Sequence, residues 1–178
     1  KVEKRIIIPT INGLKSDNLP YKGFVFIGLI MVEKEPYVIE YNVRMGDPET
    51  QVVLPRIKSD FLDLMISTAN ESLSSCEMEI LDDTYSNVVM VAGGYPEAYE
   101  KGNVITGIPE NSEETIIFQA GTKTVNTNVV TNGGRVLSIV SKGTDHKQAL
   151  SKSYKIKDKE WKNIHIIIYP DAVCYCVM

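Results

Sequence analysis

Three polar side chains alternate along one short apolar segment and have the chemistry of a metal–phosphate site. The segment is Val38-Ile39-Glu40-Tyr41-Asn42-Val43-Arg44. Residues two apart on a β-strand share a face, so Glu40, Asn42 and Arg44 are expected on one side. A carboxylate and an amide oxygen suit Mg²⁺, and an arginine beside them can hold a carboxylate or phosphate by two parallel hydrogen bonds. The alternative is a solvated strand face with a Glu40–Arg44 ion pair.

Two further charged residues lie in turns that contain glycine or proline. Asp47 is a suitable helix N-cap, with Pro48 in the first helical position. Arg135 follows Asn132-Gly133-Gly134, where glycines let backbone N–H groups approach a phosphate that the arginine would bind. The alternative for this second segment is an ordinary Asn-Gly hairpin turn.

The elements that must position these residues are mixed helix and strand. The apolar run 24–32 predicts a buried strand, and a polar turn at 33–36 joins it to a second strand at 37–44, which should pair antiparallel. Helical spacing predicts a helix within 3–16 that kinks or begins near Pro9. The clearest helix spans 59–73, with Ser59 as its cap.

Beyond residue 86 the pattern changes to short β-rich pieces separated by glycine-containing turns. A helix is expected over 144–155, and a soft boundary falls within 76–86. The whole chain is therefore expected to be α+β, with these strands in its second part: 87–91, 103–106, 115–119, 128–131 and 135–140.

Composition excludes several classes of protein. The 178 residues suit one domain, or one and part of another, and 43% hydrophobic with 24% charged residues is typical of a globular chain. A net charge of −4 gives no general attraction to nucleic acid or to an anionic membrane. Cys76, Cys174 and Cys176 form neither a disulfide framework nor a zinc site. We expect a cytoplasmic protein.

Longer motifs add a family resemblance over about residues 5–155. Residues 21–31 and the run Val-Ile-Glu-Tyr-Asn-Val-Arg-Met-Gly-Asp-Pro-Glu-Thr-Gln at 38–51 closely resemble glycinamide ribonucleotide synthetase, or phosphoribosylamine–glycine ligase, of the ATP-grasp superfamily. Shorter matches are Ala-Gly-Gly-Tyr-Pro at 92–96, Gln-Ala-Gly-Thr at 119–122 and Val-Thr-Asn-Gly-Gly-Arg-Val-Leu at 130–137. The Gly-Asp-Pro-Glu-Thr-Gln string distinguishes this family from other ATP-grasp ligases that share Glu-x-Asn-x-Arg.

The resemblance implies a fold and a division of the chain. Residues 1–80 would be the last part of an ATP-grasp domain, built of antiparallel strands and helices, and 81–160 a small β-rich C-terminal domain. Residues 161–178 depart from the family pattern as a divergent tail. Because the chain begins inside the family's ATP-grasp domain and lacks its ATP-covering segments, it is expected to have no ligase activity alone.

The resemblance also implies a reaction. The family activates glycine with ATP to a glycyl phosphate, and the amine of 5-phosphoribosylamine then attacks it in purine synthesis. Glu40 and Asn42 would be the Mg²⁺ or Mn²⁺ ligands, and Arg44 would steady the acyl phosphate or glycine carboxylate. Asp47, as an alternative or in addition to its capping role, would hold the glycine ammonium, and Arg135 a substrate phosphate.

Two other functions stay open at this point. One is a non-catalytic pseudo-domain or interaction module of a larger purine-pathway polypeptide. The other is a different ATP-grasp carboxylate–amine ligase that uses the same metal face. The expected partners are small molecules, together with other purine-pathway domains if the chain is part of a fusion, and not nucleic acid or membrane.

Overall fold

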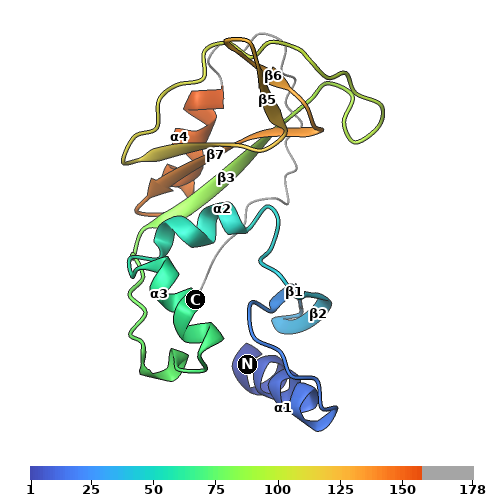
Figure 1. Cartoon of the computed structure of the whole chain (residues 1–178), viewed down its shortest axis with the longest axis vertical. Coiled ribbons are helices and arrows are strands. Elements are labelled where there is room, and N and C mark those ends of the chain that lie inside the picture. The colour runs from blue at the N-terminus through green and yellow to red at the C-terminus, as the bar shows by residue number, and fades with distance from the viewer. Residues whose placement is uncertain (158–178) are drawn as a thin grey trace. The chain divides into compact units, whose positions relative to one another are not determined.

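A computed structural model describes residues 1–157, so the tail predicted at 161–178 lies outside the described residues (Figure 1). Contacts divide the chain into two compact units. The first contains Lys1–Gly46 and Ser59–Glu79, and the second contains Asp47–Lys58 and, among the described residues, 80–157. The domain bounds drawn at 80 and 160 stay a prediction. None of the helices described is both long and apolar enough to cross a bilayer.

The first unit begins with a continuous helix that changes from π to α geometry just before Pro9, near the position where a kink or a helix start was predicted. A π-helical turn, Glu3–Ile7, leads into α1, Ile8–Ser16, which has the proline in its first turn. Proline fits the helical backbone because its ring fixes φ near the helical value, although it has no N–H to donate.

Strands β1, Phe26–Val32, and β2, Glu35–Asn42, form the predicted antiparallel pair. Glu33 and Lys34 make the connecting turn with φ of 50° and 66°, the left-handed geometry of a tight hairpin. The prediction that 24–32 is buried is wrong at its second half, where Ile30 is 50% and Met31 61% exposed. Both faces of a two-stranded ribbon need other elements packed on them to become buried. Among the described residues 1–157, the side chains of Ile30 and Met31 remain exposed to solvent.

Helix α3, Phe61–Ala69, is shorter than expected and has a different cap. Asp60, not Ser59, is the N-cap, because its carboxylate accepts hydrogen bonds from the backbone N–H groups of Leu62 and Asp63 at 2.8 and 3.1 Å. The Ser59 hydroxyl instead accepts from the N–H of Glu79 at 2.8 Å. A short 3₁₀ turn, Leu73–Ser75, follows.

The second unit contains a three-stranded antiparallel sheet of order β3-β7-β4, in which β7 is central. These strands are Thr84–Val91, Arg135–Gly143 and Thr115–Gln119, and a separate ribbon pairs β5, Thr122–Val125, with β6, Asn128–Thr131. The sequence missed β5, and the strand expected at 103–106 is only a bridge from Val104 to Val130. The alternative of a hairpin turn before Arg135 is wrong, since β6 and β7 belong to different sheets.

Two helices contact this sheet. The predicted helix near 144–155 is α4, His146–Lys157, and it packs on β3 and β7 (Figure 1). The short α2, Thr50–Val53, which continues as the 3₁₀ turn Leu54–Arg56, also contacts β3 and β7. The core cluster is apolar and includes Val88, Met90, Leu137 and Ile139, which pair across β3 and β7.

A buried hydroxyl pair joins α4 to the sheet. The Oγ atoms of Ser86 and Ser153 lie 3.1 Å apart, both residues are almost fully buried, and Ser153 Oγ also donates to the Ile139 carbonyl at 3.3 Å. Each hydroxyl therefore satisfies the other inside an apolar interface.

We expect Ser86→Ala and Ser153→Ala each to lower the free energy of unfolding by about 1–2 kcal/mol, because each leaves a buried hydroxyl with a lost partner. The double variant should lose less than the sum of the two. Urea unfolding of the four proteins measures this coupling, and strict additivity would contradict it.

Candidate functional site

Glu40 and Asn42 lie side by side on an exposed strand. The Asn42 amide nitrogen donates to Glu40 Oε1 at 2.9 Å, so both side chains occupy the same face of β2. This bond orients the amide and leaves its oxygen available beside the second carboxylate oxygen. Both groups are hard oxygen donors, which fits a divalent cation that takes its remaining ligands from substrate phosphates. Within residues 1–157, no group of three His, Cys, Asp or Glu side chains could hold a metal unaided.

A glycine on the partner strand makes room for Glu40. Gly28 pairs with Glu40 across the ribbon, and a Cβ added at Gly28 would lie 2.9 Å from Glu40 Cγ. The ladder shifts register immediately after Gly28, where Leu29 pairs with Val38. The absent side chain therefore lets the Glu40 stem lie flat over β1.

Arg44 lies on the bend after β2. Its Nη1 donates to the Met45 carbonyl at 2.9 Å. The Tyr21 hydroxyl is 2.8 Å from the Phe24 carbonyl and 3.0 Å from the Val43 carbonyl, and so ties the end of β2 to the start of β1. Since Glu40 accepts from Asn42 and Arg44 donates to its own backbone, the structure does not form the Glu40–Arg44 pair given as an alternative.

Asp47 and Arg135 are brought together in the second unit although 88 residues separate them. Arg135 Nη1 and Nη2 donate to the two carboxylate oxygens of Asp47 at 3.0 and 2.6 Å. The predicted N-cap role of Asp47 is wrong, because α2 begins at Thr50 with Glu49 as its cap residue and no side-chain cap bond. The carboxylate faces a guanidinium fork in place of helix N–H groups.

This ion pair borders a pocket of about 530 Å³, which we call the Asp47 pocket. Gln51 and Ser138 contribute polar groups to its lining, and Pro48, Val89 and Tyr95 contribute apolar ones. The Tyr95 ring lies against the backbone of Gly134, where an added Cβ would be 2.1 Å from Cδ2. Glycine is required there because any side chain would displace the ring.

Two buried acceptors near this pocket have no hydrogen-bond donor among the described residues. They are Gln51 Oε1 and Asn87 Oδ1. The Asn87 amide nitrogen donates to the Pro48 carbonyl at 3.0 Å and so anchors the chain segment of Asp47 to β3. A buried acceptor without a donor costs stability and calls for an explanation.

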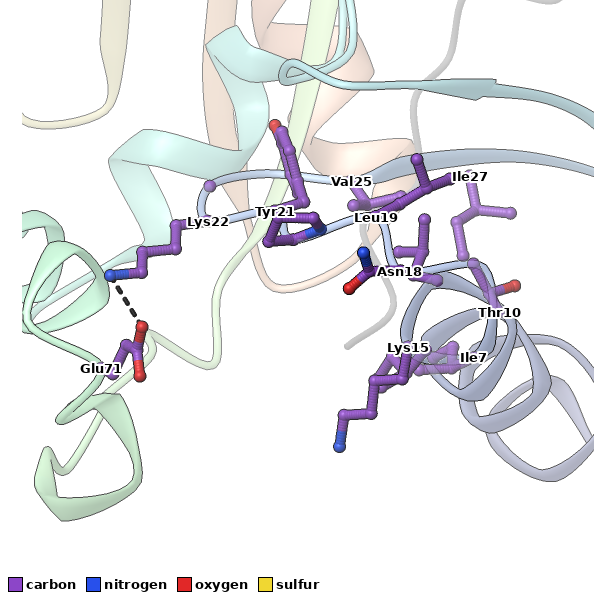
Figure 2. A pocket seen from close by; sticks show the side chains of 14 residues that line it. Ile7, Thr10, Lys15, Asn18, Leu19, Tyr21, Lys22, Val25, Ile27 and Glu71 are labelled. Atoms are coloured by element: carbon purple, nitrogen blue, oxygen red, sulfur yellow. Dashed lines mark ion pairs between the residues drawn. The ribbon is translucent and has the colours of Figure 1, made fainter.

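A second, larger hollow of about 930 Å³ lies in the first unit. Figure 2 shows its mainly aliphatic lining, including Ile7, Leu19 and Val25. Its edge carries the Lys22–Glu71 ion pair at 2.8 Å, and the hydrogen bond from Lys22 lowers the pKa of the Glu71 carboxyl below its ordinary value. None of the residues predicted from the sequence to act on substrate lines it.

Comparison with known proteins matches both parts of the chain to one family. The model of the phosphoribosylglycinamide synthetase ATP-grasp (A) domain matches residues 1–50, and that of the phosphoribosylglycinamide synthetase C domain matches residues 85–166. The chain belongs to the phosphoribosylglycinamide synthetase family. Family membership confirms the predicted resemblance and the α+β architecture.

Relatives of the family span bacteria and yeasts. The chain is 44% identical over 161 residues to phosphoribosylamine–glycine ligase of Agrobacterium fabrum. The aligned region covers 90% of this chain and 38% of the relative. It is 46% identical over 156 residues to a bifunctional purine biosynthetic protein of Pichia angusta, covering 86% of this chain and 20% of the relative. The crystal structure of phosphoribosylamine–glycine ligase from Thermotoga maritima matches with a TM-score of 0.68 and 32% identity, over 93% of this chain and 39% of that one.

The family assignment places the predicted residues in two segments. Glu40, Asn42, Arg44 and Asp47 fall within the segment matched by the synthetase ATP-grasp domain, and Arg135 falls within the C-domain segment. Sequence reasoning missed Gly28, Gln51 and Ser138 as neighbours of these groups. The signal for Gln51 was its place at the end of the Gly-Asp-Pro-Glu-Thr-Gln string, whereas Gly28 and Ser138 depend on strand register.

We expect Gly134→Ala to lower the free energy of unfolding by about 1–3 kcal/mol, because the new methyl group overlaps the Tyr95 ring. In a Tyr95→Ala background the same change should cost far less, since the obstructing ring is gone. Thermal or urea unfolding of both pairs checks this, and an equal cost in the two backgrounds would show that the overlap is not the cause.

Proposed function

We propose that this chain forms the metal-side portion of a phosphoribosylamine–glycine ligase, which joins glycine to 5-phosphoribosylamine at the expense of ATP. The observation that supports this most is the pair of oxygen donors, Glu40 and Asn42, side by side on an open strand within the segment that matches an ATP-grasp domain. The chain spans less than two-fifths of the ligases that it matches, so the complete activity requires further polypeptide.

The proposed reaction has two chemical steps. A glycine carboxylate oxygen attacks the γ-phosphorus of ATP, the bond to the β-phosphate oxygen breaks, and ADP leaves. The amine of phosphoribosylamine then attacks the acyl carbon of the glycyl phosphate, inorganic phosphate leaves, and the nitrogen loses a proton as the amide forms. No side-chain nucleophile is needed, because the acyl phosphate already carries the activated carbon.

Each proposed residue has an electrostatic or positioning role. Glu40 and Asn42 hold Mg²⁺ or Mn²⁺, which when bound offsets charge on the ATP phosphates. Arg44 steadies the acyl phosphate or the glycine carboxylate. Asp47 and Arg135 bind substrate as a pair, since the structure joins them.

The proposed ligase function also implies a pathway, a compartment and a set of partners. We propose purine biosynthesis as the pathway and the cytoplasm as the compartment, with ATP, glycine and phosphoribosylamine as small-molecule partners. Residues 1–80 are proposed as the ATP-grasp portion and 81–160 as the C-terminal domain. The bifunctional purine biosynthetic proteins of Pichia angusta and Schizosaccharomyces pombe support attachment to other purine-pathway domains.

The test is a chimera in which this chain replaces the matching segment of the Agrobacterium fabrum ligase. We expect ATP- and glycine-dependent formation of glycinamide ribonucleotide, measured by phosphate release and product mass. Glu40→Ala and Asn42→Ala should each lower kcat by about 10-fold or more, because each removes a metal ligand.

The matched control is Glu33→Ala, at an exposed turn carboxylate on the same ribbon. A folded chimera without activity would contradict the proposed function and favour a non-catalytic module. Losses below about threefold in both ligand variants would contradict the metal role, since a lost ligand costs about 10-fold or more.

Gly28→Ala tests the positioning of Glu40 without removing a ligand. Because the added methyl group would lie 2.9 Å from Glu40 Cγ, we expect a raised apparent Kd for Mn²⁺ in the chimera with little change in the KM for glycine. Gly13→Ala is the control, since a Cβ there meets nothing within 4 Å. Equal Mn²⁺ affinity in the two variants would show that Gly28 does not position Glu40.

A further inference from the structure

We propose that Tyr21 is a positioning residue for the proposed reaction, because its hydroxyl group fixes the chain at the end of β2 and so sets where Asn42 and Arg44 lie. The inference rests on the proposed function, which assigns Asn42 to the metal and Arg44 to the acyl phosphate or the glycine carboxylate. Tyr21 acts through the backbone of this strand end and not by contact with a substrate.

The ladder between β1 and β2 ends at the pair of Phe26 with Asn42. Beyond that pair, the Tyr21 hydroxyl oxygen lies 2.8 Å from the Phe24 carbonyl oxygen and 3.0 Å from the Val43 carbonyl oxygen. Both carbonyl oxygens are acceptors, so neither can bond the other, and a donor is needed between them. The phenol proton supplies it, and Tyr21 thereby extends the connection between the two chain segments past the last strand pair.

Arg44 depends on this connection because its own side chain does not hold the segment in place. Its guanidinium donates to the carbonyl of the next residue, Met45, at 2.9 Å, a local bond that does not tie it to another element. The side chain of Val43 is 72% exposed, so packing contributes little there. The hydrogen bond from Tyr21 to the Val43 carbonyl therefore restrains the backbone one residue before Arg44.

Tyr21 itself lies on an anchored segment. Lys22 Nζ forms an ion pair with Glu71 at 2.8 Å (Figure 2) and donates to the Ala69 carbonyl at 3.1 Å, which joins the next residue of the chain to the C-terminal end of α3. Gly23 has a φ of 137°, and a Cβ added there would lie 3.0 Å from the Tyr21 hydroxyl oxygen. Glycine at this position therefore lets the ring reach the strand ends, and the hydroxyl group has a defined place.

The first test uses the 178-residue chain and needs no substrate. Tyr21→Phe removes the phenol oxygen and its proton and keeps the ring. We expect the ¹³C carbonyl resonances of Phe24 and Val43 to shift, because they lose their shared donor, and the ¹⁵N order parameter of the Arg44 amide to fall. An unchanged order parameter at Arg44 would overturn the inference, because the strand end would then be held without Tyr21.

The matched control is Tyr37→Phe, which removes the same hydroxyl group from the other end of β2. Tyr37 is exposed, and no residue of the described part of the chain forms a hydrogen bond with its hydroxyl. This variant should leave the Val43 carbonyl resonance and the order parameter of Arg44 unchanged. Equal effects of the two variants would overturn the inference, because the loss would then not come from the Tyr21 hydrogen bond.

Kinetics of the chimera distinguish positioning from a purely structural role. Tyr21→Phe should lower kcat about fivefold, the factor that corresponds to one hydrogen bond, and leave the KM for phosphoribosylamine unchanged. The urea midpoint should fall only slightly, because Tyr21 is 41% exposed and water can replace the lost donor. A lower midpoint with an unchanged kcat would show a structural role alone and overturn the inference.

The same measurements separate this inference from the proposed function. An inactive chimera removes the proposed function, on which the role of Tyr21 in the reaction depends. An active chimera in which Tyr21→Phe keeps its kcat removes only the positioning role and leaves the proposed function in place.

Discussion

A bidentate guanidinium–carboxylate contact ties the segment before α2 to the central strand of the sheet in the second unit. Arg135 stands at the start of the central strand β7, and Asp47 stands just before α2. Their contact, together with the bond from Asn87 to the Pro48 carbonyl, fixes residues 47–51 against the sheet. An exposed pair of this kind contributes little stability by itself, so its importance lies in geometry: it determines which groups border the pocket.

In the first unit, too, a small number of contacts positions the polar groups of the proposed site. Two oxygen donors are positioned by a two-stranded ribbon, a hydrogen bond from Asn42 to Glu40, and a glycine beneath the Glu40 stem. Neither donor is buried in a rigid cage, which suits a cation that arrives with a nucleotide and leaves with the product. Charge compensation by substrate phosphates, not by a dense protein ligand set, is the physical basis of the proposed metal role.

Glycine has a different purpose at each of two decisive positions. Gly28 lets a long acidic side chain lie across a neighbouring strand, and Gly134 lets an aromatic ring touch the backbone. In both places the missing Cβ sets the position of another residue's functional group. These glycines act by positioning neighbouring side chains. A search of the sequence for charged and polar side chains therefore did not find them.

Local patterns in the sequence determined much of this protein: the β1–β2 hairpin, α4, most strands of the sheet, the shared face of Glu40 and Asn42, and the family. These features depend on residue period, turn chemistry and motif, which act over a few positions. Tertiary structure alone decided the partner of Asp47, the missed strand β5, the Asp60 cap in place of Ser59, and the unpartnered oxygen of Gln51. Those outcomes depend on which of several competing hydrogen-bond partners comes within reach, and residues 88 positions apart meet only after the chain has folded.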